Sequence, residues 1–397
     1  MAYELLSHLY YKDKNDYMNL YKRRIESEST YMLPVKIGNN KAFYCLCPEI
    51  YDASLSILKL DKEVSQLRRN LPSAALSQFT RKCLIDEIRL TNDIEGVYST
   101  RKELSLVLNE LNKSGKKKRF FGLINKYSML ISGYEFSLSS SSDIREIYND
   151  LVLKEVKEDC EDNMPDGEIF RKGMAEVVTS TQKVIHSGVY PETKIVQLME
   201  QSLNILNNNE LPVLIRIAVF HYLFGYIHPF YDGNGRTSRF ISSYLLTKEF
   251  EFLIGFRLSY TIKERIKSYY NAFKECNDEK NMGDLTPFII MFLNIILESF
   301  VNLRDALKRR KELYIKYISA VMENDHMSSD LKETAHILIQ TSLFSDEGIT
   351  KKQLQEELKI SASTVDKRLR ELREKNMLIE DKSEKTFKYH IDLNSVI

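Results

Sequence analysis

Residues 228–239, which read H-P-F-Y-D-G-N-G-R-T-S-R, constrain this chain more than any other segment. The residues before them, 211–227, are mostly apolar and predict a buried helix that Pro229 interrupts. Helical spacing resumes after Gly235, so a turn with two glycines lies at the start of a second helix. The first N–H groups of a helix have no intrahelical partner and carry the positive end of its dipole. The turn therefore predicts an anion site.

The charged side chains of this segment fit such a site. Arg236 and Arg239 are three residues apart on one helix face, where two guanidinium groups can converge on a polyphosphate. Asp232 precedes the turn and can offer carboxylate oxygen to a hard cation such as Mg²⁺. His228 can accept a proton near neutral pH. The segment therefore predicts phosphate chemistry.

The same residues resemble the signature of the Fic (filamentation induced by cAMP) family, H-P-F-x-[DE]-G-N-G-R-x-x-R, at every specified position. The resemblance implies that AMP is transferred from ATP to a Ser, Thr or Tyr hydroxyl of a protein, the chain itself included. It implies that His228 deprotonates this hydroxyl and that Asp232 binds Mg²⁺ or Mn²⁺. It assigns the phosphates to three turn residues and two arginines, namely Gly233, Asn234, Gly235, Arg236 and Arg239. The competing interpretation is an ordinary turn with an N-cap Asp and solvated arginines.

A second match lies upstream, where residues 91–96 read T-N-D-I-E-G within a helix expected over about 81–96. It resembles the inhibitory motif [ST]-x-x-x-E-[GN] of Fic proteins that carry an inhibitory helix before the core. The residues that the motif specifies are Thr91, Glu95 and Gly96. The resemblance implies that Glu95 pairs with Arg239, which then cannot take the γ-phosphate, and that the carboxylate repels the triphosphate. Taken alone, the motif also fits a surface i,i+4 pair closed by a glycine C-cap.

Residues 167–191 hold β-branched residues around a Thr-Ser-Thr run and end in turn formers, so they predict a hairpin. Fic proteins place a hairpin flap beside the active site, where it holds an extended target segment by main-chain pairing. By this resemblance residues 177–185 are the flap. Its target-binding residues would be Val177, Val178, Thr179, Ser180 and Thr181. A structural hairpin without a target role is the alternative.

Two residues after the signature segment match Fic positions that line the adenine pocket. Tyr270 and Asn277 lie seven residues apart on a predicted helix. An aromatic residue at helical spacing is also typical of a buried core, so both interpretations stay open. His221, seven residues before His228, is interpreted as a packed core histidine.

The C-terminal part of the chain is expected to form a separate module, reached through a charged helix over 303–322. Its pattern of three helices and a strand resembles a winged helix-turn-helix, at residues 329–344, 350–358, 361–376 and 386–391. Five residues of the third helix would face a groove, namely Ser363, Thr364, Lys367, Arg368 and Arg370. Residues 349–397 hold eleven Lys and Arg against nine Asp and Glu, a difference of plus two. Because this excess is small, a protein-interaction or dimerisation role competes with DNA binding.

Charge, cysteine content and hydropathy exclude several classes of protein. The 397 residues carry a net charge of +1, which excludes a strongly basic nucleic-acid-binding chain and an acidic solvating chain. The five cysteines contain no C-x-x-C pair, which argues against a disulfide framework and a four-ligand zinc site. No signal-peptide pattern opens the chain, and the apolar stretch 288–301 is too short to span a bilayer. We therefore expect a cytoplasmic protein with no membrane partner.

Together these patterns predict a mostly α-helical protein in three parts. Residues 1–112 carry the inhibitory helix, residues 113–310 form a Fic core with a small β-hairpin flap, and residues 311–397 form a winged helix-turn-helix domain. The predicted activity is that of a nucleotidyltransferase, a protein adenylyltransferase that uses Mg-ATP and is restrained by Glu95. Two alternatives stay open: removal of AMP with Glu95 orienting a water, and a DNA-binding regulator whose Fic core senses nucleotide. The oligomeric state, a homodimer included, is open as well.

Overall fold

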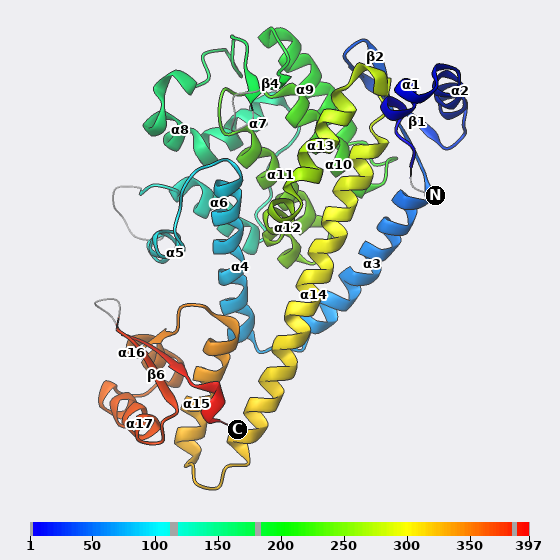
Figure 1. Ribbon diagram of the computed structural model, residues 1–397. Coiled ribbons are helices and arrows are strands. Elements are labelled where there is room, and N and C mark those ends of the chain that lie inside the picture. Colours follow the sequence, from blue (N-terminus) through cyan, green and yellow to red (C-terminus); the bar gives the residue numbers. More distant parts are fainter. Residues whose placement is uncertain (1–2, 112–117, 179–183, 383–386, 397) are drawn as a thin grey trace. The chain divides into compact units, whose positions relative to one another are not determined.

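The computed structural model describes residues 3–111, 118–178, 184–382 and 387–396 (Figure 1). The protein is mostly α-helical with short antiparallel strand pairs, as the sequence predicts. Its chain forms two compact units. Unit 1 comprises Met1–Asp61 and Leu84–Val301, and unit 2 comprises Lys62–Cys83 and Asn302–Ile397. Each unit therefore combines segments that are far apart in the sequence, and three helices contribute residues to both.

The elements before the site are mostly helices with one hairpin. They are α1 (Leu6–Lys12), α2 (Lys14–Ile25), β1 (Thr30–Ile37), β2 (Asn40–Cys45), α3 (Pro48–Arg69), α4 (Ser73–Ile94), α5 (Arg101–Asn109), α6 (Phe121–Ile131), α7 (Ser141–Tyr148), a π-helical turn (Asn149–Leu153) and α8 (Lys154–Asp159). The remaining elements of unit 1 are β3 (Glu176–Val178), β4 (Val184–Ser187), α9 (Glu192–Leu206), α10 (Val213–Ile227), α11 (Asn234–Glu249), α12 (Leu258–Glu264), α13 (Ile266–Asn277) and the first part of α14 (Thr286–Met322).

Helix α10 lies in the centre of unit 1. Its sequence is apolar on every face, and most of its side chains are buried, which is the pattern of a helix enclosed by its neighbours. It packs against α9 and α11 (Figure 1). Because α10 and α11 are consecutive and adjacent, the loop that joins them is held between two fixed ends.

Helix α4 begins earlier than the sequence indicated. It starts at Ser73 rather than near Arg81, because Ala75, Phe79 and Cys83 continue the apolar spacing upstream and are buried. It ends at Ile94, and Gly96 follows with a φ of +73°, as in many helix C-termini. The first part of α4 belongs to unit 2 and the second part to unit 1.

Helix α14 also differs from the expectation. The predicted core helix over 288–301 and the predicted charged helix over 303–322 are one continuous helix, Thr286–Met322. Its apolar part is long enough to cross a membrane by length and mean hydropathy, but 56% of that window is buried inside the protein. This is the packing of a core helix, which agrees with the expected role of residues 288–301.

The hairpin expected near residue 177 is present as β3 and β4. The two strands are antiparallel, with Glu176 opposite Ser187 and Val177 opposite His186. Three of the residues expected to contact a target, Thr179, Ser180 and Thr181, lie outside the described residues.

Unit 2 contains the winged helix-turn-helix order that the sequence predicts. Its helices after α14 are α15 (Ser329–Phe344), α16 (Lys351–Leu358) and α17 (Ala362–Glu374). Its sheet has the order β5 (Ile349–Thr350), β7 (Lys388–Ile391), β6 (Leu378–Asp381). Leu338, Val365, Leu372 and Tyr389 are among the buried residues that join these helices to the sheet.

One expected groove-facing residue of α17 is in fact buried. Arg368 is 7% exposed and bonds to Asp330 at 2.9 Å and to Glu333 at 3.2 Å. It lies between the buried Val365 and Leu372 on the helix face that packs against α15, so helical spacing turns it inward. The prediction that Arg368 faces a groove is therefore wrong. The other four residues of that prediction are exposed or half-buried, namely Ser363, Thr364, Lys367 and Arg370.

Candidate active site

The loop between α10 and α11 is closed by its own polar groups. Helix α10 ends where the backbone of His228 turns left-handed, with φ 51° and ψ 63°. The Asn234 side chain donates to the Phe230 carbonyl at 2.8 Å and accepts from the Phe230 N–H at 3.0 Å. The Asn234 carboxamide is thus committed to the loop, which leaves its backbone N–H at the helix start.

The first turn of α11 faces a carboxylate from another helix. Gly233 is the N-cap residue with φ 81°, and no side chain caps the helix. A Cβ at Gly235 would lie only 2.0 Å from Glu95 Oε1. The Glu95 carboxylate therefore lies against the glycine backbone, at the positive end of the helix dipole. Asp232 precedes this turn, and its Oδ1 accepts from the Gly233 N–H at 2.5 Å.

Thr91 and Glu95 together engage every nitrogen of the Arg239 guanidinium. Nη1 pairs with Glu95 Oε1 at 2.8 Å. Nε donates to Thr91 Oγ1 at 2.7 Å, and Nη2 donates to the Thr91 carbonyl at 3.0 Å. Burial alone would lower the pKa of Arg239, but Glu95 and Tyr269 more than offset it and the pKa is raised. The predicted contact between Glu95 and Arg239 is present, and Thr91 contributes two further bonds.

Arg236 is fully buried but only partly paired. Its Nη1 lies 3.3 Å from Glu155 Oε2, and its Nη2 lies 3.6 Å from Asp232 Oδ1. Nε and Nη2 have no hydrogen-bond partner. Burial raises the pKa of Glu155 to about 7, and Arg236 opposes this shift. Buried donors without acceptors are uncommon in folded proteins, so these two nitrogens mark a place where an anion would be stabilised.

A chain of polar side chains lies behind Arg239. His221 is buried, with Nε2 2.7 Å from Tyr269 Oη and Nδ1 2.8 Å from Ser242 Oγ. Burial and, to a smaller extent, the charge of Arg239 lower the pKa of His221 to about 3, so the imidazole stays neutral. The interpretation of His221 as a core histidine is confirmed, although it is also part of the environment of Arg239.

The two residues expected at the adenine pocket are in different surroundings. Tyr270 is 38% exposed, and its pKa is raised by partial burial and then by the charge of Glu95, which places it near the ion pair of Glu95 and Arg239. The Asn277 Oδ1 accepts a hydrogen bond from Tyr222 Oη at 2.7 Å. Tyr270 is thus close to Glu95 and Arg239, while Asn277 is bonded to α10.

Two acidic residues near these arginines, Glu155 and Glu87, are not among the residues expected at the site. Glu155 pairs with Arg236 from a helix 81 residues away in the chain. Glu87 lies one turn before Thr91 and accepts from the Ser259 N–H at 3.0 Å and from its hydroxyl at 2.5 Å. The i,i+4 spacing of Glu87, Thr91 and Glu95 is a usable signal, because it would put all three on one face of the helix expected over about 81–96. Nothing in the sequence near Glu155 distinguishes it from its charged neighbours.

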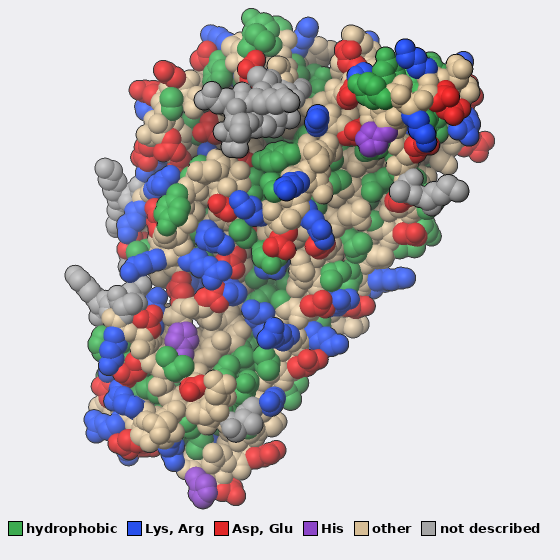
Figure 2. Space-filling model, viewed as in Figure 1, with side chains coloured by type: hydrophobic (Ala, Val, Ile, Leu, Met, Phe, Trp, Pro, Cys, Tyr) green, Lys and Arg blue, Asp and Glu red, His purple; other side chains and the backbone are tan. Residues whose placement is uncertain are grey.

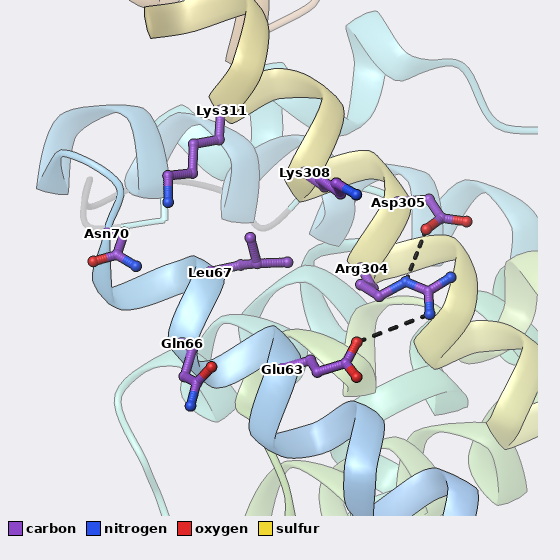
Figure 3. Close-up of a pocket in the computed structure, with 8 residues that line it drawn as sticks. All are labelled: Glu63, Gln66, Leu67, Asn70, Arg304, Asp305, Lys308 and Lys311. Carbon is purple, nitrogen blue, oxygen red and sulfur yellow. Dashed lines mark hydrogen bonds and ion pairs between the residues drawn. The ribbon is translucent and has the colours of Figure 1, made fainter.

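An open groove in unit 2 does not resemble this site. It has a volume of about 450 Å³ and lies between α3 and α14 (Figure 3). Its lining is Glu63, Gln66, Leu67, Asn70, Arg304, Asp305, Lys308 and Lys311. Arg304 is already paired there with Asp305 at 2.8 Å and with Glu63 at 3.9 Å. No residue of the signature segment lines it, so the loop before α11 remains the candidate active site.

Comparison with known proteins agrees with this geometry. Residues 138–246 match the model of the Fic/DOC family, and this range includes the whole signature segment.

The chain contains a Fic domain.

Relatives of the Fic domain include the protein adenylyltransferase Fic of Drosophila grimshawi, which is 30% identical over 168 residues. The protein of the same name from Drosophila virilis is 29% identical over 146 residues. These alignments cover 42% and 37% of this chain, and 28% and 26% of the two relatives. The chain thus spans about a quarter of the length of the relatives that it matches.

The fold is shared more widely than the sequence. The crystal structure of a Fic family protein from Desulfovibrio desulfuricans G20 superposes with a TM-score of 0.52 at 19% identity. The superposition covers 91% of this chain and 98% of that one. In unit 2, residues 339–379 match the model described as winged helix-turn-helix DNA-binding. The chain therefore combines a Fic domain with a C-terminal winged helix-turn-helix.

Proposed function

We propose that this protein is an adenylyltransferase that transfers AMP from Mg-ATP to a Ser, Thr or Tyr hydroxyl of a protein, and that Glu95 restrains it. One observation carries the proposal: the Glu95 carboxylate lies against the Gly235 backbone and on Arg239 at the start of α11. A protein carboxylate in this position fills a site built for an anion. A nucleotide triphosphate would compete with it for the same donors.

Phosphate binding would use backbone and guanidinium donors together. The backbone N–H groups of Gly233, Asn234 and Gly235 are at the N-terminus of α11. Arg236 adds two buried nitrogens that lack partners. Arg239 adds three more once Thr91 and Glu95 release it. Preorganised donors of this kind stabilise charge that develops on transferred and departing phosphates.

A bound metal ion would take its ligands from the nucleotide as well as from the protein. Among the described residues, no three His, Cys, Asp or Glu side chains come together as a metal site. Asp232 offers one carboxylate beside the helix start, which fits Mg²⁺ or Mn²⁺ bound by one carboxylate and by phosphate oxygens. When bound, the cation would neutralise phosphate charge, and Asp232 would orient it.

Proton transfer and target binding would use His228 and the β3–β4 hairpin. His228 would accept the proton of the incoming hydroxyl, which suits an imidazole near neutral pH. The backbone of β3, including Val177 and Val178, would hold an extended target segment by strand addition. Tyr270 and Asn277 on α13 are our proposed contacts for the adenine base.

The proposal is tested by removing the restraining carboxylate. Glu95→Gly should increase transfer of label from ATP labelled at the α-phosphate, because Arg239 and the helix start become available. Asp93→Gly is the matched control, since Asp93 is a nearby carboxylate that pairs with Lys263 at 2.9 Å instead. Adding His228→Ala to the Glu95→Gly variant should abolish labelling. No gain from Glu95→Gly, or an equal gain from Asp93→Gly, would contradict the inhibitory role.

Removal of AMP is a second candidate for the same site. The Glu95 side chain is 25% exposed, so a water could reach the carboxylate at the phosphate site. If Glu95 orients such a water, the wild-type protein should release AMP from a modified target and Glu95→Gly should not. Release by both variants would exclude this role.

Binding of DNA by unit 2 is a separate candidate, favoured by the family match of residues 339–379. Lys367 and Arg370 are exposed on α17 and could meet phosphates. On the face shown in Figure 2, however, charges of both signs are interspersed, in line with the net charge of +1. A salt-titrated binding assay with duplex DNA decides the question, because affinity that never exceeds non-specific levels would leave the module as a protein contact surface.

A further inference from the structure

Arg171 is a fully buried arginine, and within the described part of the chain its guanidinium bonds only to backbone carbonyls. Its Nε donates to the His228 carbonyl at 2.9 Å, and Nη2 donates to the Val189 carbonyl at 2.9 Å. Nη1 donates to the Gly173 carbonyl at 2.5 Å, and Nη2 has a longer contact of 3.5 Å to the Ile227 carbonyl. No carboxylate of the described chain forms an ion pair with it. Burial lowers its pKa, with Tyr231 and Asp166 opposing the shift.

One group of these bonds fixes the end of α10. The carbonyls of Ile227, His228 and Pro229 are consecutive, and all three accept from residue 171, the last from its backbone N–H at 3.2 Å. They lie at the negative end of the helix dipole, where a buried cation is favourable. The His228 backbone is left-handed, a strained conformation for a non-glycine residue that needs support from its surroundings. Arg171 supplies that support at the carbonyl of His228 itself.

The other bonds fix the base of the flap. Gly173 and Val189 lie just outside the two ends of the β3–β4 hairpin, and both of their carbonyls accept from Arg171. A Cβ at Gly188 would lie 2.4 Å from Arg171 Nη2, so the chain passes close to the guanidinium at this point. One planar group therefore connects both ends of the hairpin to the loop that carries His228.

We infer that Arg171 is a positioning residue that sets the flap and the His228 loop in register with each other. The flap would determine the position of a target segment that pairs with β3, and the loop determines the position of the His228 imidazole. The distance between the hydroxyl and the imidazole therefore depends on the group that joins them. Misplacement of reacting groups by about 1 Å can cost on the order of 100-fold in rate. The inference rests on the proposed transferase function and deepens it.

The test compares Arg171→Met and Arg171→Lys in the Glu95→Gly background. Met keeps the apolar stem and removes all donors, while Lys keeps the charge but has one nitrogen that cannot serve both sides. The matched control is Arg216→Met, because Arg216 is likewise an arginine that donates to a backbone carbonyl, that of Leu206 at 2.9 Å, and it lies on α10 more than two turns before His228. Rates of target labelling, the KM for ATP and hydrogen exchange of peptides over 225–233 and 184–191 are measured for each.

Arg171→Met should lower kcat about 100-fold with the KM for ATP within about twofold, since Arg171 touches no phosphate donor. Arg171→Lys should recover part of the loss, and Arg216→Met should match the parent. Exchange over both peptides should rise on the order of tenfold for Arg171→Met alone. A kcat within twofold of the parent, full recovery by Lys, or an equal loss of kcat and ATP affinity would overturn the inference. Hydrogen exchange keeps the test independent of the proposed function, because it reports on the loop and flap even if the parent transfers no label.

Discussion

Arg239 in the Fic domain and Arg368 in the winged helix are both buried arginines held by carboxylates, yet their surroundings differ. Arg239 is held by Thr91 and Glu95, and the Glu95 carboxylate also covers the start of α11. Arg368 is held by Asp330 and Glu333, whose side chains are 72% and 58% exposed. The first arginine has an anion cradle beside it, and the second joins two packed helices.

This difference shows that a buried ion pair does not by itself mark a regulated site. Ion pairs of this kind also occur where they only hold elements together. What distinguishes Glu95 is a second contact, because its carboxylate lies against the Gly235 backbone at the start of α11 as well as on the arginine. Under the proposed function a nucleotide would replace the carboxylate at Arg239, whereas the described residues around Arg368 include no helix start of this kind.

The largest effect is expected at Arg239. In the Glu95→Gly background, Arg239→Met should lower the rate of label transfer from ATP by about 10²–10³-fold, because a guanidinium that stabilises phosphate charge is lost. Arg368→Met in the same background should leave the rate unchanged. Initial rates at saturating ATP check both variants. Equal losses at the two positions would remove the distinction between them.

The next effect concerns pH and the buried carboxylate that anchors α4. Burial raises the pKa of Glu87 from 4.5 to about 7, although its bonds to Ser259 oppose the shift. The folded protein then binds more protons than the unfolded chain between these values, so stability falls as pH rises from about 4.5 to about 7. Glu87→Gln should remove this pH dependence, which amounts to up to about 3 kcal/mol in the free energy of unfolding.

Unfolding midpoints of wild type and Glu87→Gln at pH 5 and pH 8 provide the measurement. The unfolding midpoint of Glu87→Gln relative to that of wild type should be higher at pH 8 than at pH 5. An identical pH dependence in the two proteins would show that Glu87 keeps an ordinary pKa.

Arg368→Met should have a smaller effect, confined to stability. Asp330 and Glu333 are exposed enough to be hydrated without the arginine, so the loss should be about 1 kcal/mol. Thermal unfolding of the full chain reports it. A loss above about 3 kcal/mol would mean that Asp330 and Glu333 are desolvated and that the pair is more like that of Arg239.

The smallest effect is expected for the exposed cations of α17. If duplex DNA binds unit 2, Lys367→Met and Arg370→Met should each reduce the salt dependence of log K by about one unit of slope. Arg368→Met should leave the slope unchanged, because its guanidinium is not at the surface. Titrations at several salt concentrations measure the slopes. A reduced slope for Arg368→Met alone would mean that Arg368, and not Lys367 or Arg370, contacts the DNA phosphates.

Local patterns predicted the parts of the molecule whose contacts are close in sequence. The start of α11, the two signature arginines and the winged-helix order follow from spacing within a few turns. The contact between Glu95 and Arg239 was accessible only through the resemblance, because 144 positions separate the two residues.

Other features could not be predicted because their signal is tertiary. Arg171 lies in residues 167–191, where the pattern predicts a hairpin but does not indicate a buried arginine, and only the convergence of four carbonyls accounts for its burial. An outward Arg368 is what the sequence predicts, because its partners Asp330 and Glu333 on α15 are not apparent from the sequence. The continuity of α14 was not predicted, because the change from apolar to charged side chains near residue 303 suggests two helices. Charged side chains do not interrupt a helix, and the structure has one.

The division of α4 has a practical consequence for anyone who shortens this protein. A fragment that begins at Leu84, the edge of unit 1, retains only the stretch to Ile94 of the helix that carries Thr91. Isolated helices shorter than about 12–15 residues are marginal in water, and their ends fray. Such a truncated enzyme would hold Glu95 less firmly and would be more active than the intact chain, so activity measured on the fragment would overstate that of the whole.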